Sequence, residues 1–189
     1  MTDSHDALQR TLDRLSPLVA RLLDAPDNAP LRRLVRAHVL AGLRLLDGVH
    51  KGVLLEFLYE GGLIGGFDDG PGAPVAPRIL LGGADLRNAD LHHRNLGRAH
   101  LAGVILNEAD LQGAYLAGAN LSGADLINTD LAGVDLSTAN LVLADLTGAN
   151  LAGATLIRAD LRGAKVTEEQ LSQAKSLKGA IMPDGTRHD

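Results

Sequence analysis

The chain has 189 residues, a formal net charge of −5 and 46% hydrophobic residues, which is enough apolar material for one folded domain with an appended segment. Aromatic residues make up only 2% and cysteine is absent, so the core must be aliphatic, and disulfides, thiolate metal sites and a cysteine nucleophile are excluded. The negative balance argues against direct nucleic-acid binding, which requires clustered lysine and arginine.

The beginning of the chain carries Asp3 and Asp6, with no long apolar segment behind them. We therefore expect no secretory signal. Elsewhere, no uncharged apolar run approaches the roughly 18 residues that a membrane span needs. A cytoplasmic location is the expectation.

Two helical regions are predicted in the N-terminal third. In the first region, one helical face is an apolar stripe and consists of Leu8, Leu12, Leu15, Val19 and Leu22. Pro17 lies inside this stripe, so either the helix kinks there or Ser16 and Pro17 begin a new helix. The second region spans 30–60 with a break near Asp47 and Gly48. Glycine and proline are frequent from 65 to 77, which predicts a partly extended linker.

A five-residue repeat fills the central part of the chain. Every fifth residue from Leu81 to Leu161 is leucine, and the residue two positions earlier is most often alanine. Exceptions at this alanine position include Arg94, Val104, Thr129 and Val134. Glycine frequently occupies the second position after leucine, where it can supply the positive φ that tight turns require.

A period of five fits neither an α-helix nor a long alternating strand, so the chain must turn at each unit. We interpret each unit as a very short strand followed by a corner. Four units then close a coil of about twenty residues, with leucine and alanine facing inward and coils stacked at roughly 4.8 Å. Alternating large and small side chains can fill such a tube at close-packed density.

The unit, alanine then aspartate or asparagine then leucine and two variable residues, resembles the pentapeptide-repeat family over residues 79–166. This resemblance implies a β-solenoid, namely a right-handed quadrilateral β-helix of about four coils. The segment Lys51 to Ile64 is similar to the helix that precedes the repeat in one subgroup, and we interpret it as an N-terminal cap. Family members serve many roles, so the fold does not by itself imply a function.

A C-terminal cap is expected because a β-helix leaves open strand edges at its ends. Thr167, Glu168, Glu169 and Gln170 match a capping box, which predicts a short helix to about Lys175. The predicted organisation is a helical N-terminal region and cap at 1–64, the linker at 65–77, the β-helix at 78–166, and a helical cap and tail at 167–189.

Two sets of polar residues contain residue types that occur in metal or catalytic sites. His92, His93 and His100 with Asp90 include metal-ligand types, but His100 falls two units away and solvated surface histidines are the favoured interpretation. A period of twenty also stacks Asp90, Asp110 and Asp130, yet aspartate before leucine is explained by local turn hydrogen bonds. We therefore expect no metal, cofactor or catalytic residue.

Arg94 occupies an inward alanine position, where an unpaired guanidinium is costly. Since it lies in the first coil, it can extend through the open end toward the N-terminal cap. We predict that Arg94 anchors this cap by pairing with Glu56 or Glu60.

Val142 and Leu143 both follow a leucine, so we expect them to face outward on one side, with Ile127 around a neighbouring corner. Exposed apolar clusters mark contact surfaces. These three residues are the candidate interface.

The predicted function is a non-enzymatic protein-binding or scaffold module whose partner is another protein or a second copy of this chain. The alternative comes from resemblance: some pentapeptide proteins mimic DNA with acidic residues and bind DNA gyrase. The corresponding acidic face here would comprise Asp110, Asp125, Asp130, Asp135 and Asp145. Against this alternative, every central residue is leucine and the column has only about four coils.

Overall fold

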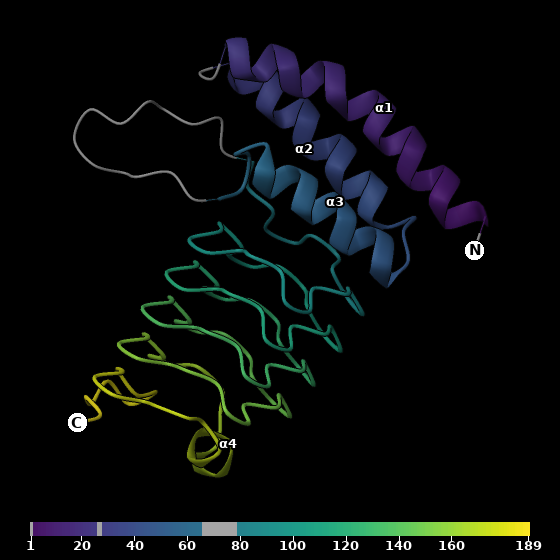
Figure 1. The fold of residues 1–189 in the computed structure, drawn as a ribbon. Coiled ribbons are helices and arrows are strands. Elements are labelled where there is room, and N and C mark those ends of the chain that lie inside the picture. Colours follow the sequence, from purple (N-terminus) through teal and green to yellow (C-terminus); the bar gives the residue numbers. More distant parts are fainter. Residues whose placement is uncertain (1, 26–27, 66–78) are drawn as a thin grey trace.

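A computed structural model describes residues 2–25, 28–65 and 79–189. Three helices, α1, α2 and α3, lie over one end of a column of stacked coils, and a short helix, α4, lies at the other end (Figure 1). The predicted linker at 65–77 falls almost wholly outside the described residues.

Helix α1 runs without interruption over Thr2–Asp24, and its predicted apolar stripe packs mainly on α2. Pro17 therefore neither ends this helix nor begins a second one. Pro17 is exposed, so water can reach the carbonyl group that loses its helical partner.

The second helical region divides into α2, Ala29–Leu43, and α3, Gly48–Glu60. The side chain of Asn28 accepts a hydrogen bond from the Leu31 N–H and caps α2, while Asp47 accepts from the His50 N–H and caps α3. The predicted break near Asp47 and Gly48 is confirmed, because Asp47 is the residue that begins the next helix.

The column is built from coils of twenty residues. Parallel bridges join residues twenty apart, as in Asp85 with Ile105, Ile105 with Asp125 and Asp125 with Asp145. Four repeat units therefore complete one coil, as the sequence predicts. Consecutive units lie on successive sides, and residues twenty apart form vertical rows.

The in-phase leucines form the core of the column, since each one from Leu81 to Leu161 is at most 1% exposed. Burying one such side chain contributes roughly 1.5 to 3 kcal/mol, so the leucine rows are the main stabilising element. The alanine position is also buried in most units. Thr129 is tolerated there because its hydroxyl donates to the carbonyl oxygen of Leu106 at 2.9 Å.

At the N-terminal end, α3 lies directly on the first coil (Figure 1). A Cβ atom at Gly48 would be 2.0 Å from the Asn88 carbonyl oxygen, and one at Gly52 would be 2.1 Å from that of Asp90. The Gly48 carbonyl also accepts a hydrogen bond from the Asp90 N–H at 2.9 Å. Only residues without a side chain permit this contact between helix and coil.

At the C-terminal end, α4 spans Glu168–Ser172 and is shorter than the predicted helix to Lys175. The predicted helical cap and tail at 167–189 is corrected further, because the coil resumes after α4. Ser176 bridges Thr155 and Ile181 bridges Asp160, which are pairs separated by twenty-one residues. One extra residue in the α4 segment accounts for this shift of register.

None of the helices in the described residues is both long enough and apolar enough to span a membrane.

Candidate interaction surfaces

The N-terminal cap satisfies backbone groups that the first coil leaves without a neighbouring coil. Arg36 donates to the carbonyl oxygens of Leu80 and Gly82 at 2.6 and 2.8 Å. Lys51 Nζ donates to the Arg87 carbonyl at 2.8 Å, and the Tyr59 hydroxyl to the Gly97 carbonyl at 3.0 Å. Gly82, Arg87 and Gly97 occupy the same position of three repeat units, immediately after the leucine.

These three donors were missed by sequence reasoning. Lys51 is nearly buried, and such burial of a lysine requires a polar partner. Burial also raises the pKa of Tyr59, with a smaller contribution from Tyr115. For Lys51 and Tyr59, the signal in the sequence is the presence of polar side chains in the otherwise apolar segment from 51 to 64.

Arg94 and Glu56 form an ion pair between the first coil and α3. The Arg94 side chain is 32% exposed and that of Glu56 is 41% exposed, so the pair lies at the rim of the cap. Glu60, the other predicted partner, lines the same small cavity of about 210 Å³ with Arg94, Tyr59 and Gly52. Sequence reasoning thus named the region that this arginine contacts.

The five aspartates grouped above as one acidic face lie on three different sides of the column. Asp110 and Asp130 share a row, Asp125 and Asp145 share another, and Asp135 pairs with Tyr115 in a third. The prediction of a single acidic face is therefore wrong. Residues five apart lie on successive sides, so acidic residues that follow one another in the sequence wrap around the column.

Several of these carboxylates also accept hydrogen bonds from lysine or asparagine side chains. Lys165 donates to Asp145 at 2.7 Å, and this hydrogen bond is the main reason that the pKa of Asp145 falls to about 2. Asn107 donates to Asp125 and Asn150 donates to Asp130, each at 3.0 Å. The predicted local turn bonds are present as well, as in the bond from the Gln112 N–H to Asp110 at 2.9 Å.

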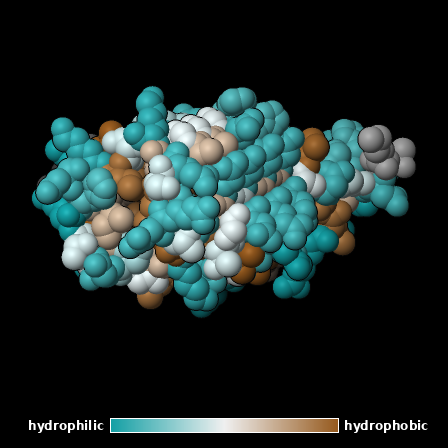
Figure 2. Space-filling model, turned by 90° about the horizontal axis from the view of Figure 1, so that it is seen from below, coloured by the Kyte–Doolittle hydropathy of each residue, from teal (hydrophilic) through white to brown (hydrophobic). Residues whose placement is uncertain are grey.

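Leu143 is the most exposed of the large hydrophobic side chains in the described residues, at 70%. The other two residues of the predicted interface, Ile127 and Val142, are half-buried, and they lie at two different corners of the column. On the face shown in Figure 2, hydrophilic side chains predominate and hydrophobic ones form small separate areas. Leu143 therefore projects from the column by itself, and the other two residues of the predicted interface are only partly exposed.

The backbone of Leu143 has a φ of 61°. The equivalent corner residue is glycine in many units, and the other non-glycine residues with positive φ in the described parts are Asn88, His93, Arg98, Glu108, Asn128, Thr138 and Arg158. Leucine is unfavourable in this conformation by about 1–2 kcal/mol. The side chain lies over Gly163, where a Cβ would be 2.8 Å from Leu143 Cδ2.

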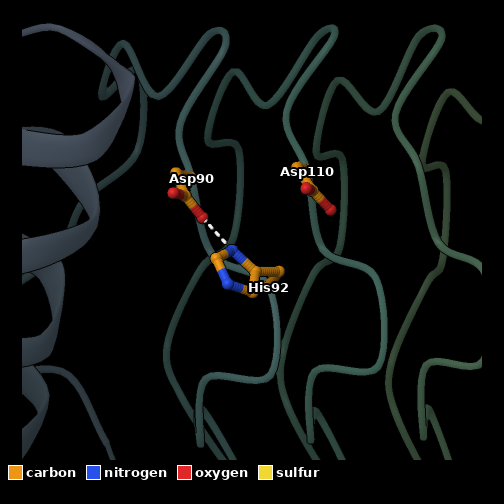
Figure 3. A group of neighbouring side chains, drawn as sticks. All are labelled: Asp90, His92 and Asp110. Carbon is orange, nitrogen blue, oxygen red and sulfur yellow. Dashed lines mark hydrogen bonds and ion pairs between the residues drawn. The ribbon is translucent and has the colours of Figure 1, made fainter.

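The histidines do not gather in the way considered from the sequence. His92 contacts Asp90, and its ring packs edge-on against that of His93 at 5.6 Å between centroids. His100 lies in another row, where it bridges Asn120. The residue that does approach His92 is Asp110, which comes from the next coil (Figure 3).

The stacked coils of five-residue units define a repeat protein of the solenoid class. A family model of pentapeptide repeats matches in 8 copies, over residues 84–123, 105–141 and 139–175. The chain is a member of the pentapeptide-repeat family.

Solved structures of this family are similar to parts of the chain. HetL from the cyanobacterium Nostoc sp. strain PCC 7120, a protein involved in heterocyst differentiation regulation, is 39% identical over 57% of this chain and 55% of its own, with a TM-score of 0.41. A second Nostoc protein, alr5209, is 35% identical over 51% of this chain and 79% of its own, with a TM-score of 0.44.

QnrB1, a plasmid-mediated fluoroquinolone resistance protein, is 17% identical over 51% of this chain and 59% of its own, with a TM-score of 0.25. The match to HetL spans little more than half of that protein. No curated protein matches the chain.

Proposed function

We propose that this chain is a non-enzymatic protein-binding module, in which a rigid column presents Leu143, with Val142 and Ile127 beside it, to an apolar pocket of a partner protein. The main observation in support of this proposal is the backbone conformation of Leu143. A large apolar side chain occupies a strained corner and is 70% exposed. The fold requires a positive φ at this corner but not a leucine, and residues held in unfavourable backbone conformations cluster at functional sites.

The surroundings of Leu143 support a contact at this corner. The equivalent residues one coil above and one coil below are Gly123 and Gly163, neither of which has a side chain to screen the leucine. A partner can therefore approach Leu143 over Gly123, where a Cβ would meet nothing within 4 Å, while the other side of the leucine rests on Gly163. The partner is a second protein or a second copy of this chain.

The test compares Leu143→Gly with a control at another exposed leucine, Leu45→Ala, which is 67% exposed in the wild-type chain and lies on the helical cap. We expect Leu143→Gly to remain folded, because it removes about 1–2 kcal/mol of backbone strain. The same change should abolish binding to a partner captured by the wild-type chain, or dissociate a dimer in sedimentation velocity. Retention of binding by Leu143→Gly, or an equal loss in Leu45→Ala, contradicts the proposal.

The alternative of DNA mimicry toward DNA gyrase gains no support from this geometry. The acidic residues occupy three sides, and Lys165 neutralises one of them. A duplex presents one charge per roughly 1.7 Å of its axis. Likeness to QnrB1 at 17% identity does not bear on the partner.

Four further assignments belong to this proposal. The column is the right-handed quadrilateral β-helix that the family implies, and residues 1–64 serve as its N-terminal cap. Arg94 and Glu56 anchor that cap through their ion pair. The module acts in the cytoplasm.

A further inference from the structure

A mixed group of possible metal ligands lies on one side of the column, away from Leu143. Asp90 and Asp110 are bridge partners in adjacent coils, so their side chains leave the column one above the other. His92 begins the corner that follows Asp90, and its Nδ1 contacts Asp90 Oδ1. One ligand atom from each residue lies within 4.8 Å of the others (Figure 3).

Three other aspartates of the column each have a cationic partner. Asp85 has Arg87 and Lys51, Asp145 has Lys165, and Asp160 has Arg162 as a cationic partner. In the described parts of the chain, neither Asp90 nor Asp110 pairs with lysine or arginine. Their polar side-chain contacts are His92 and the Gln112 N–H, respectively.

The stacking makes this arrangement unfavourable without a cation. Asp110 lies between Asp90 and Asp130 in one row of carboxylates. Like charges held one coil apart repel each other, and backbone hydrogen bonds between the coils prevent the row from spreading. A bound cation would remove this repulsion.

We propose that Asp90, His92 and Asp110 bind one divalent transition-metal ion. An imidazole nitrogen with two carboxylate oxygens is a ligand set that suits zinc, and ligand distances near 2.0–2.2 Å require only modest side-chain rotation from the present separation. His92 is 52% exposed and Asp90 34% exposed, which leaves the outer coordination positions open to water.

This site is independent of the proposed protein contact. It also differs from the histidine cluster considered in the sequence, since His93 and His100 are not ligands. Asp110 takes their place because the coil returns to the same side after twenty residues. His93 lies over Gly113 on the same corner and therefore serves as a matched control.

The test is titration of the full chain with Zn²⁺ at neutral pH, followed by calorimetry or by competition with a chromogenic chelator. We expect one saturable ion per chain in the wild type. His92→Ala and Asp110→Asn should each lower the affinity by roughly tenfold or more, equivalent to about 1.4 kcal/mol. His93→Ala and Asp135→Asn should leave the affinity unchanged.

Circular dichroism of each variant establishes that the column is intact, and the substituted side chains are on its surface. A second measurement is the thermal midpoint, which Zn²⁺ should raise in the wild type and in His93→Ala but not in His92→Ala. Absence of a saturable site in the wild type overturns the proposal. Equal losses in His92→Ala and His93→Ala also overturn it, because they would indicate nonspecific binding to exposed imidazoles.

Discussion

The two ends of the column solve the same problem with different means. Each end lacks a neighbouring coil, so backbone groups there have no strand to pair with. At the N-terminal end, Arg36, Lys51 and Tyr59 supply side-chain donors from two helices. At the C-terminal end, Gln170 Nε2 alone donates to the carbonyl oxygens of Leu146 and Ala149, at 2.7 and 2.8 Å.

The position of Gln170 shows how closely its side chain replaces a coil. One unit earlier in the same coil, the Ala144 carbonyl accepts from the Lys165 N–H, and one unit later the Ala154 carbonyl accepts from the Lys175 N–H. Ala149 is the corresponding residue between them, and it receives the glutamine amide instead. Side chains and close packing of α3 thus cover the N-terminal edge, whereas at the C-terminal edge Gln170 fills one gap in backbone pairing that resumes at Lys175.

The largest expected effect is at the close contact between α3 and the first coil. Gly52→Ala places a Cβ 2.1 Å from the Asp90 carbonyl oxygen, so α3 must move away from the column. We expect a loss of roughly 2–3 kcal/mol in the free energy of unfolding by denaturant titration. Gly82→Ala, whose Cβ would be 3.5 Å from its nearest neighbour, is the control and should be tolerated. Equal stability of the two variants would contradict this account of the contact.

The next effect tests whether Gln170 stabilises α4 or the coil. Its Oε1 accepts from the Thr167 N–H at 3.0 Å, while its Nε2 binds the coil carbonyls. Gln170→Ala removes both and should cost about 2 kcal/mol. Gln170→Glu keeps the oxygen that accepts from the Thr167 N–H but loses the N–H group that donates to the coil. Its thermal midpoint should therefore fall at least as far as that of Gln170→Ala. A glutamate variant as stable as the wild type would show that the helix cap alone matters.

A smaller effect is expected at the ion pair between Arg94 and Glu56, because both side chains are partly exposed. Arg94→Ala should cost about 1 kcal/mol. Hydrogen exchange should become faster in α3 and remain unchanged in the coils below. Arg98→Ala, at an exposed corner nearby, is the control. Unchanged exchange in α3 would exclude a cap-anchoring role for Arg94.

The smallest effect concerns pH at the C-terminal part of the column. Lys165 holds the pKa of Asp145 at about 2, below the value near 3.9 of an unfolded aspartate. The resulting stabilisation is complete above the unfolded value and disappears as the pH falls toward 2. Asp145→Asn should therefore be less stable than the wild type at pH 6, and the difference should be much smaller near pH 2, in urea titrations. A difference that persists unchanged at the lower pH would disprove the assignment.

Some features of the sites were accessible from the sequence because they depend on spacing alone. The unfavourable inward position of Arg94 pointed to the cap, and the structure places Glu56 against it. The period of twenty correctly stacked Asp110 on Asp90. The same period separates the five aspartates into three rows, which is why they do not form the single acidic face that was predicted.

The column could be predicted from the repeat, because each five-residue unit carries its own leucine, its own small residue and its own corner. Because every unit repeats the same local preferences, the position of one unit predicts that of the next. How the ends are covered and which surface groups meet depends instead on long-range contacts. Arg36 lies 46 residues from Gly82, and His92 meets Asp110 only after the chain has completed a coil. Such contacts depend on the docking of unlike elements, for which the repeat provides no pattern.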